Sequence, residues 1–346
     1  MTRFLFVGLG AIGQRHLRNL RALLGAEVEI AAYRTRGQTH VLSDRLDVEA
    51  EDGLHERYDI RVFSDLDEAL AMRPGAVFIC SPSSRHLPVA LKAAAAGCNL
   101  FIEKPLSDSY EGVDALIACV EEQNLVALVG YQWRFHPCVL RVRELLEQEA
   151  VGRIVAVRAQ VGEYLPDWHR YEDYRQTYSA QRELGGGTLL SQIHEMDYLY
   201  WFFGLPQRVF CVGGHLSGLE IDVEDVSSTL MEFEIDGRIV PVHLHQDYLQ
   251  RPPSRSCHII GDEGRIEMDL VSQTVRMFDG TGALGAEHDF SGVTRDELFR
   301  QELQHFLACL EGGRAPSVSV RDAAASLRMA LAAKESVETR QIVELK

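Results

Sequence analysis

Long apolar runs are absent from this chain of 346 residues, and none approaches the roughly 20 residues that a membrane-spanning helix needs. No charged segment followed by a short apolar stretch, the pattern of a secretory signal, precedes Phe4. The seven cysteines are scattered and never form a Cys-x-x-Cys pair, which favours reduced thiols over a disulfide framework. These absences predict a cytoplasmic protein with no membrane partner.

Basic residues are scarce: 35 lysines and arginines stand against 51 aspartates and glutamates, for a formal net charge of -16. This charge would repel a phosphate backbone, so nucleic acid is excluded as a partner. A metal site is not expected either, because His243 and His245 alternate on one predicted strand without a cysteine or carboxylate at metal-ligand spacing. A chain of this length predicts two domains.

A glycine-rich junction near the start is the strongest positive signal. The sequence GLGAIG, from Gly8 to Gly13, follows an apolar run and precedes leucines at helical spacing. In a dinucleotide-binding fold, the first glycine permits the turn, the second lets the backbone approach the pyrophosphate, and the third lets the helix pack on its strand. A purely structural turn is the alternative. The predicted cofactor contacts in this loop are Gly8, Gly10, Ala11, Ile12 and Gly13.

Strand-like and helix-like patterns alternate after this junction. The alternation predicts an α/β fold, a doubly wound parallel sheet of Rossmann type, over residues 1–125. The polar, acidic segment 44–58 is expected to be a helix or a loop. The expected strands after the first are Val28–Ala32, Ala76–Cys80, Leu100–Ile102 and Leu125–Val129, and the expected helices are Asp65–Met72 behind a Ser64 cap, Leu87–Ala96 and Tyr110–Glu122.

The pattern changes to long strand-like runs after Arg153, with short polar turns that are typical of hairpins. Residues 126–346 are predicted to form an α+β domain on one large, open, mainly antiparallel sheet. This division leaves open whether the C-terminal helices pack back on the first domain. The expected strands are Ile154–Val161, Val209–Gly213, Ser227–Phe233, Ile239–Leu244, Cys257–Ile260, Arg265–Leu270 and Thr274–Phe278, and the expected helices are Thr188–Phe203, Arg295–Leu310 and Arg321–Ser336.

The tripeptide Glu103-Lys104-Pro105 stands at the end of the strand predicted at Leu100–Ile102. Ligands of such sheets bind beyond the carboxyl ends of the strands, so Lys104 is aimed at the same crevice as the glycine loop. Proline fixes φ and donates no hydrogen bond, which helps to hold the turn of the lysine. Taken alone, Lys104 has the alternative interpretation of a solvated surface charge.

The helix predicted at Thr188–Phe203 presents two faces. The apolar stripe is expected to pack on the sheet. The second face is polar and aromatic and follows the three glycines 185–187, which suits a ligand-binding wall. A hydrogen-bonded structural histidine is the alternative for His194. The stripe comprises Leu189, Ile193, Met196, Tyr200 and Phe203, and the second face comprises Ser191, His194, Tyr198 and Trp201.

These motifs resemble the family of glucose-fructose oxidoreductase, inositol dehydrogenase and MocA (Gfo/Idh/MocA). The family pattern is an N-terminal GxGxxG, an EKP near residue 100, and a histidine-bearing helix after a glycine-rich run; here these are Gly8 to Gly13, Glu103 to Pro105, and His194 after residues 185–187. The resemblance covers essentially the whole chain. It implies an NAD(P)-dependent oxidoreductase whose second domain is a twisted open sheet that binds substrate and commonly builds oligomers.

One departure from the family pattern concerns the residues before His194. Many members place an aspartate three or four residues before the histidine, where it assists the catalytic lysine and histidine. This chain has Ser191 and Leu190 at those places. Serine carries no charge that would raise the basicity of His194, so Asp197 or the substrate itself is expected to take that role.

Oxidation of an alcohol requires a base and a cation, and the histidine of the predicted helix and the lysine of Glu103-Lys104-Pro105 are residues of these types. Conversion of an alcohol to a ketone sends a hydride to nicotinamide and releases a proton, so a base must lie within hydrogen-bond reach of the hydroxyl. We predict His194 as this base. A fixed cation near the same oxygen stabilises the developing alkoxide, and we predict Lys104 for that role.

The residues after the second predicted strand bear on the choice of cofactor. An acidic residue there binds the ribose 2′-hydroxyl of NAD, whereas arginine accommodates a 2′-phosphate. The chain reads Tyr33-Arg34-Thr35-Arg36, so NADP is preferred over NAD, with solvated loop arginines as the alternative. The remaining predicted cofactor contacts are Ser81, Pro82, His86, Glu103, Lys104 and Gln132.

A segment rich in aromatic and basic residues, from Tyr164 to Arg182, bears on the substrate. Aromatic faces stack on sugar rings and arginines bind carboxylate or phosphate, so an anionic or nucleotide-linked sugar is plausible. An arm whose aromatics bury against a neighbouring subunit is the equally weighted alternative. The predicted substrate contacts are Arg134, Tyr164, Trp168, Ser191 and His194; for Arg134 an ion pair between domains is the alternative.

Together these features predict an NAD(P)-dependent oxidoreductase that interconverts a hydroxyl and a ketone on a sugar, polyol or sugar derivative. We expect a homo-oligomer, a dimer or a tetramer. Two rival functions stay open: a redox-neutral enzyme that cleaves glycosides with a tightly held cofactor, and a non-catalytic dinucleotide sensor.

Overall fold

The computed structural model describes residues 3–25, 28–35, 40–43, 46–50, 53–312 and 314–345. Contacts along the chain define two compact units. The first unit comprises Met1–Tyr131, His169–Asp173 and Phe299–Ala324, and the second comprises Gln132–Trp168, Tyr174–Leu298 and Ala325–Lys346. None of the described helices is both long and apolar enough to cross a membrane.

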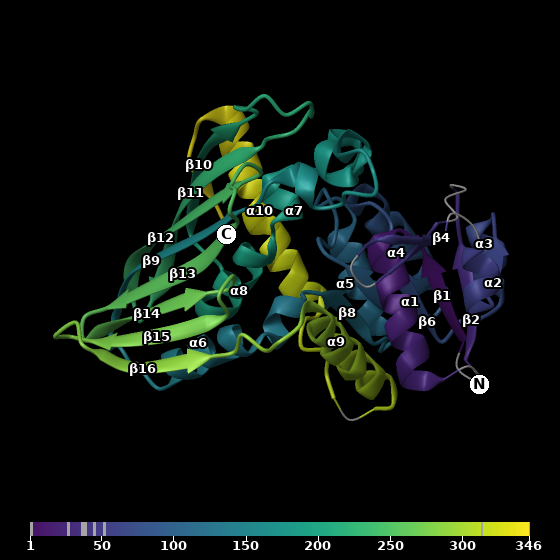
Figure 1. Ribbon diagram of the computed structural model, residues 1–346, viewed down its shortest axis with the longest axis horizontal. Coiled ribbons are helices and arrows are strands. Elements are labelled where there is room, and N and C mark those ends of the chain that lie inside the picture. Colours follow the sequence, from purple (N-terminus) through teal and green to yellow (C-terminus); the bar gives the residue numbers. More distant parts are fainter. Residues whose placement is uncertain are drawn as a thin grey trace. The chain divides into compact units, whose positions relative to one another are not determined.

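A parallel sheet of six strands forms the first unit, in the order β5-β2-β1-β6-β7-β8 (Figure 1). The chain passes from β1 to β2 and β5 on one side and from β6 to β7 and β8 on the other, so the order reverses between β1 and β6. The predicted doubly wound fold is confirmed. The strands are β1 (Arg3–Val7), β2 (Glu29–Tyr33), β5 (Arg61–Phe63), β6 (Ala76–Ile79), β7 (Asn99–Glu103) and β8 (Ala127–Gly130).

Stacked phenylalanines make the centre of this unit's core. The rings of Phe6, Phe78 and Phe101 stack across β1, β6 and β7, with centroids 4.7 and 5.0 Å apart. The edge of Phe306, from α9 (Arg295–Leu310), meets Phe78 and Phe101. Leu17 of α1 (Ala11–Leu24) belongs to the same cluster. Because side chains alternate between the two faces of a strand, these rings lie on one face of the sheet. Helix α1 and the residues of α9 from Phe299 onward cover that face.

The other helices of the first unit are α3 (Leu66–Ala71), α4 (His86–Ala95) and α5 (Val113–Glu122), and α4 packs on β6 and β7. The predicted cap of α3 was wrong by one residue: the Asp65 carboxylate, not Ser64, accepts the Glu68 backbone N–H. Between β2 and β5 the structure has β3 (Val41–Leu42), β4 (Val48–Ala50) and α2 (Leu54–Tyr58).

The boundary drawn from the sequence, at residues 125 and 126, differs from the contact units. Strand β8 joins the parallel sheet through β7, so it belongs with the first unit. The residues from Phe299 to Ala324, which include most of α9 and the start of α10 (Val320–Thr339), also fall in that unit.

A sheet of nine strands forms the second unit, in the order β16-β15-β14-β13-β9-β12-β11-β10-β17. Every neighbouring pair is antiparallel except β9 and β12, which confirms the predicted mainly antiparallel sheet. β16 and β17 were not predicted. The strands are β9 (Ile154–Gly162), β10 (Arg208–Gly214), β11 (Val226–Ile235), β12 (Arg238–Asp247), β13 (Ser254–Gly261), β14 (Gly264–Asp269), β15 (Thr274–Asp279), β16 (Leu284–Asp289) and β17 (Val343–Glu344).

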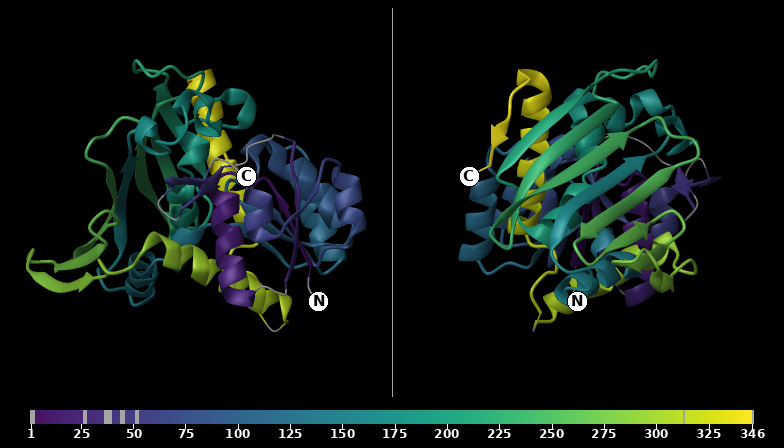
Figure 2. Two further views of the ribbon diagram at one scale, coloured as in Figure 1. Left: turned by 45° about the vertical axis from the view of Figure 1, so that its right-hand side comes forward. Right: turned by 90° about the vertical axis from the view of Figure 1, so that its left-hand side faces the viewer.

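The two faces of this sheet differ. α6 (Pro137–Glu147), α7 (Thr188–Ser191) and α8 (His194–Phe203) pack on the inner face, which carries the alternating buried residues. Among the described residues of this unit, no helix crosses the outer face, which faces the viewer in the right-hand panel of Figure 2. Large apolar side chains stand exposed there, among them Phe210, Val212, Leu230 and Ile239.

The single helix predicted at Thr188–Phe203 is interrupted. α7 ends at Ser191 and α8 begins at His194. The side chain of Gln246, from β12, donates to the backbone carbonyls of both Thr188 and Gln192. Gln192 leaves the helical conformation at this break, with φ -100° and ψ 37°, and its carbonyl is bonded to the sheet.

Candidate active site

The carboxyl ends of the parallel strands align the predicted cofactor residues. The register pairs Val7 of β1 with Tyr33 of β2 and with Ile79 of β6, and it pairs Ile79 with Ile102 of β7. The segments that follow these strands, which begin at Gly8, Arg34, Cys80 and Glu103, therefore leave the sheet at one edge. In sheets of this kind, ligands bind at that edge where the strand order reverses.

Gly8, Gly10 and Gly13 differ in what surrounds them. Gly8 has φ +93, and a Cβ on it would lie 2.8 Å from the Cys80 carbonyl oxygen. A Cβ on Gly13 would collide with the Gly8 carbonyl, so both positions need glycine for packing. A Cβ on Gly10 would meet nothing within 4 Å. Only Gly10 is therefore open to a close-approaching ligand.

The start of α1 fits an anion beside this open position. Gly10 caps the helix without a side-chain hydrogen bond, and no acidic residue stands in the first turn. Ala11 and Ile12 form that turn and are half-buried. The backbone N–H groups of a helix start bind phosphate through hydrogen bonds and the helix dipole. The residues present thus fit the pyrophosphate of a dinucleotide.

Ser81, Pro82 and His86 follow β6. Ser81 and Pro82 are half-buried, and Pro82 precedes the short helix η1 (Ser83–Arg85). Both ring nitrogens of buried His86 lie 2.7 Å from carbonyl oxygens, Nδ1 from that of Pro105 and Nε2 from that of Ser81. Burial lowers the pKa of His86, against the opposite effect of these two carbonyls. His86 ties the end of β6 to the turn after β7, and its contact with a cofactor stays a prediction.

Glu103 and Lys104 end β7, and a cis peptide bond joins Lys104 to Pro105. Lys104 is half-buried. Glu103 was predicted to contact the cofactor, but its carboxylate is engaged inside the unit: Oε1 lies 2.6 Å from His16 Nε2, and Oε2 accepts the Lys104 backbone N–H at 3.2 Å. The sequence offered no sign of this bond, because 87 residues separate its partners.

Arg34 follows β2, as predicted, and its backbone N–H donates to the Phe63 carbonyl of β5. Its guanidinium Nη1 lies 3.4 Å from Nε2 of His55, on α2. Partial burial lowers the pKa of Arg34. Arg36, the other arginine of this loop, lies outside the described residues. His55 was missed by the sequence reasoning, since nothing in the pattern of segment 44–58 placed it beside β2.

His194 begins α8 in the second unit, and it is buried. The ring of Trp133 stands edge-on to its imidazole, with centroids 6.2 Å apart. The guanidinium of Arg255, from β13, lies 4.8 Å from the centre of the Trp133 ring and donates to the Glu195 carboxylate at 2.8 Å. Burial opposes the charge of Arg255, but Glu195 and Glu163 keep its pKa raised. These contacts fix the first turn of α8.

Arg134 also holds the first turn of α8, through Asp197. Its guanidinium donates to both carboxylate oxygens of Asp197, at 2.8 and 2.7 Å, and Ser326 donates to Asp197 at 3.1 Å. Both side chains of the pair are buried. The pair lies within the second unit, so it is not an ion pair between domains. The contact of Arg134 with substrate stays a prediction. Asp197 is likewise committed to this pair, which argues against it as the partner of His194.

Ser191, Tyr164 and Trp168 lie around Tyr248 and Arg251, which were not among the predicted site residues. Burial strongly raises the pKa of Tyr248, and the nearby Ser191 side chain opposes that rise. Trp168 meets the same Tyr248 ring edge-on at 5.3 Å. The Arg251 guanidinium lies 3.7 Å from the centre of the Tyr164 ring. Gln132, predicted as a cofactor contact, is buried at the start of η2 (Gln132–Phe135).

Comparison with known families adds to this geometry. Residues 2–131 match the description "Oxidoreductase family, NAD-binding Rossmann fold" of the GFO_IDH_MocA family, and residues 139–267 match the "GFO/IDH/MocA C-terminal domain". The chain belongs to the Gfo/Idh/MocA oxidoreductase family. The resemblance expected from the sequence, including the oxidoreductase class and the NAD-binding domain, is confirmed.

Individual members of the family are similar over nearly the whole chain. Myo-inositol 2-dehydrogenase from Thermotoga maritima is 24% identical to this chain, and the match covers 98% of this chain and 97% of the relative. D-xylose 1-dehydrogenase (NADP(+)) 2 from Haloferax volcanii is 25% identical and covers 99% of each. The solved structure of the WlbA dehydrogenase from Bordetella pertussis, in complex with NADH and UDP-GlcNAcA, shares the fold of this chain with a TM-score of 0.80. The two sequences are 21% identical, and the match covers 100% of this chain and 99% of that one.

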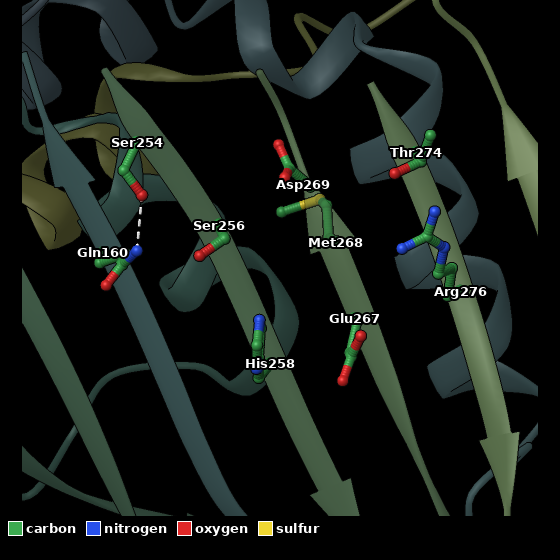
Figure 3. A pocket seen from close by; sticks show the side chains of 9 residues that line it. All are labelled: Gln160, Ser254, Ser256, His258, Glu267, Met268, Asp269, Thr274 and Arg276. Atoms are coloured by element: carbon green, nitrogen blue, oxygen red, sulfur yellow. Dashed lines mark hydrogen bonds between the residues drawn. The ribbon is translucent and has the colours of Figure 1, made fainter. Parts of the chain in front are cut away.

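A shallow depression on the outer face of the large sheet lies apart from these Gfo/Idh/MocA motifs (Figure 3). Its volume is about 190 Å³, smaller than the ligand pockets typical of proteins. Because Arg255 points to α8, its neighbours Ser254 and Ser256, which line the depression, point to the opposite face. His258 and Arg276 face Glu267 and Asp269 there, so no single charge is favoured. No three histidine, cysteine or acidic side chains in the described ranges group as a metal site.

Proposed function

We propose that this protein is a dehydrogenase or reductase that prefers NADP(H) and interconverts a hydroxyl and a ketone on a sugar, polyol or sugar derivative. The observation that carries the proposal is the single sheet edge from which the open Gly10 loop and Lys104 both emerge, after β1 and β7. The inositol and xylose dehydrogenases similar to this chain support the substrate class.

His194 is proposed as the base that accepts the proton of the reacting hydroxyl, and as the acid in the reverse direction. Lys104 is proposed to stabilise the developing negative charge on the same oxygen. Bound nicotinamide would supply the acceptor or donor of the hydride. Ser191 stands where many relatives have an aspartate, and the Trp133 ring beside the imidazole is one contact that positions His194.

Arg34 and His55 support NADP over NAD. A 2′-phosphate is doubly negative, and charge-assisted hydrogen bonds from a guanidinium are the strongest that a side chain offers it. His55 lies 3.4 Å from Arg34 and is placed to add a second donor. The ribose 2′-hydroxyl of NAD would instead call for a carboxylate after β2, where the chain has Arg34-Thr35.

Tyr164 and Arg251 support an anionic or nucleotide-linked sugar as substrate. Arg251 is exposed and stacks on the Tyr164 ring, so an aromatic platform and a cation stand together. Sugar rings pack on aromatic faces, and arginine binds carboxylate or phosphate. Both residues belong to the second unit, with His194.

The outer face of the large sheet supports assembly into a homo-oligomer. Val212 is 50% exposed and Leu230 is 50% exposed, on neighbouring strands β10 and β11. Contiguous exposed apolar side chains on a sheet are typical of an interaction surface. A second copy of the chain is the proposed occupant.

Two measurements on the purified protein test the proposed function. Nicotinamide fluorescence gives the affinities for NADPH and NADH, and we expect tighter binding of NADPH. A panel of inositols, aldoses, sugar acids and nucleotide sugars is then screened for cofactor reduction. Tight cofactor binding with no turnover on any compound would favour the dinucleotide sensor, and products formed without net cofactor reduction would favour the redox-neutral enzyme.

A further inference from the structure

A buried imidazole–carboxylate pair lies directly behind Lys104. His16 Nε2 and Glu103 Oε1 are 2.6 Å apart, and the His16 side chain is 0% exposed. The other carboxylate oxygen, Oε2, accepts the Lys104 backbone N–H at 3.2 Å. The carboxylate therefore bonds helix α1 on one side and the lysine's own peptide on the other.

The surroundings of His16 fix which nitrogen carries the proton. Its ring meets Phe101 and Phe299 at centroid distances of 4.7 and 5.6 Å, so aromatic rings enclose it. Within the described ranges, Nδ1 has no hydrogen-bond partner. A neutral imidazole with its proton on Nε2 satisfies this arrangement, because that N–H donates to the carboxylate and no buried donor is left unpaired.

Glu103 has little room to adopt another position. Glu103, the last residue of β7, pairs in register with Gly130 of β8. A Cβ on Gly130 would lie 3.4 Å from Glu103 Oε1, so the carboxylate fills the space that this glycine leaves. With both oxygens bonded and one flank closed by β8, the acid acts as a rigid link between His16 and Lys104.

We propose that His16 is a positioning residue for Lys104. By holding the Glu103 carboxylate, it keeps the Lys104 peptide N–H bonded and so fixes the turn from which the ammonium projects. His16 stands on α1, one turn after Gly13, and thereby ties the turn of the lysine to the helix that opens in the glycine loop. The importance of this turn for catalysis rests on the proposed function; the link itself does not.

Backbone amide exchange at Lys104 tests the link without a substrate. His16→Phe keeps an aromatic ring among Phe101 and Phe299 but removes the donor, and it should speed exchange of the Lys104 amide about 10-fold or more by allowing local opening. His16→Gln loses the ring but keeps an N–H donor, and it should restore slow exchange. NADPH affinity should change by less than about threefold in both, since the Gly8–Gly13 loop is untouched.

A matched control separates the link from general loosening of the core. Phe306→Leu removes a ring that packs on the same Phe78 and Phe101 but bonds to neither member of the pair. It should lower thermal stability while leaving Lys104 exchange slow. Wild-type exchange in His16→Phe, or equally fast exchange in Phe306→Leu, would overturn the proposal. If His16→Phe does not fold, Glu103→Gln keeps the size, removes the charge, and is expected to speed exchange likewise.

Turnover provides the second readout once an active compound is found. In His16→Phe we expect kcat to fall about 10-fold with KM little changed, and His16→Gln to recover most of it. If no compound turns over, the proposed function fails while the exchange result still decides the link. If turnover is found and His16→Phe retains wild-type kcat despite fast exchange, the positioning role is wrong.

Discussion

Single side chains at the ends of the parallel strands determine which ligand this protein can hold. Gly10 leaves its backbone open where Gly8 and Gly13 are closed by their neighbours. Arg34 stands after β2 with His55 beside it. A sequence motif alone does not show which of its residues face a ligand and which stabilise the fold. That distinction depends on contacts with residues far along the chain.

Replacing Arg34 tests the choice between the two nicotinamide cofactors. We expect Arg34→Ala to weaken NADPH binding about 10-fold or more, the value of a charge-assisted hydrogen bond, and to leave NADH binding nearly unchanged. Arg57→Ala, which removes an exposed arginine of the same region paired with Glu49, is the matched control. Fluorescence titration of both cofactors measures the effect, and an equal loss for NADH and NADPH would remove the argument from Arg34.

At the scale of elements, the start of α6 offers a stability test that is independent of activity. His136 caps this helix: its Nδ1 accepts the Cys138 backbone N–H at 3.1 Å. Burial, reinforced by the positive charge of Arg255, lowers the pKa of His136 to about 4. Nδ1 of His136 has no lone pair left to accept the Cys138 N–H once it is protonated. The folded state therefore favours the neutral imidazole.

The sign of the pH effect follows from this lowered pKa. An unfolded histidine gains its proton near pH 6.5, and His136 in the folded chain resists it down to about pH 4. The contribution to stability is therefore full above pH 6.5 and is lost as the pH falls from 6.5 to 4, by on the order of 3 kcal/mol.

His136→Asn checks this prediction, because asparagine caps a helix but does not titrate. Urea unfolding should show a smaller loss of stability between pH 7 and pH 4.5 in His136→Asn than in the wild type. The same acid sensitivity in both proteins would show that other groups cause it.

How well elements could be predicted depended on whether their signal was local. Periodicity placed α9 at its observed bounds, Arg295–Leu310, and placed β9 within one residue of its end at Gly162. The break between α7 and α8 could not be foreseen, since the side chain that bonds the backbone there belongs to Gln246, 54 residues from Gln192. Short, weakly apolar strands such as β16 have no clear alternation of their own.

For the whole molecule, the sequence predicted the family, the sheet types and the edge that carries Gly10 and Lys104. It did not predict the internal partners of three site candidates. Glu103 bonds His16, His86 bonds the Pro105 carbonyl, and Arg134 bonds Asp197, at sequence separations of 87, 19 and 63 residues. Each of these residues has the chemistry of a ligand-binding group, and only the tertiary partner reveals that it supports the fold.

Assembly is the prediction that belongs to the whole molecule. Leu230→Glu places a charge in the centre of the exposed apolar strip on β10 and β11, and should convert the oligomer to smaller species because burying an unpaired charge is costly. Val271→Glu, at another exposed apolar position outside that strip, is the control. Light scattering after size exclusion gives the masses. Unchanged mass in Leu230→Glu, or a monomeric wild type, would contradict the proposed interface.

The most direct test of the central claim, that Lys104 and His194 carry the proton chemistry of a hydride transfer, is the initial rate of cofactor reduction in three proteins on one active compound. We expect Lys104→Met and His194→Gln each to lower kcat about 100-fold or more, with NADPH affinity in His194→Gln close to that of the wild type. Wild-type rates in both variants would contradict the account.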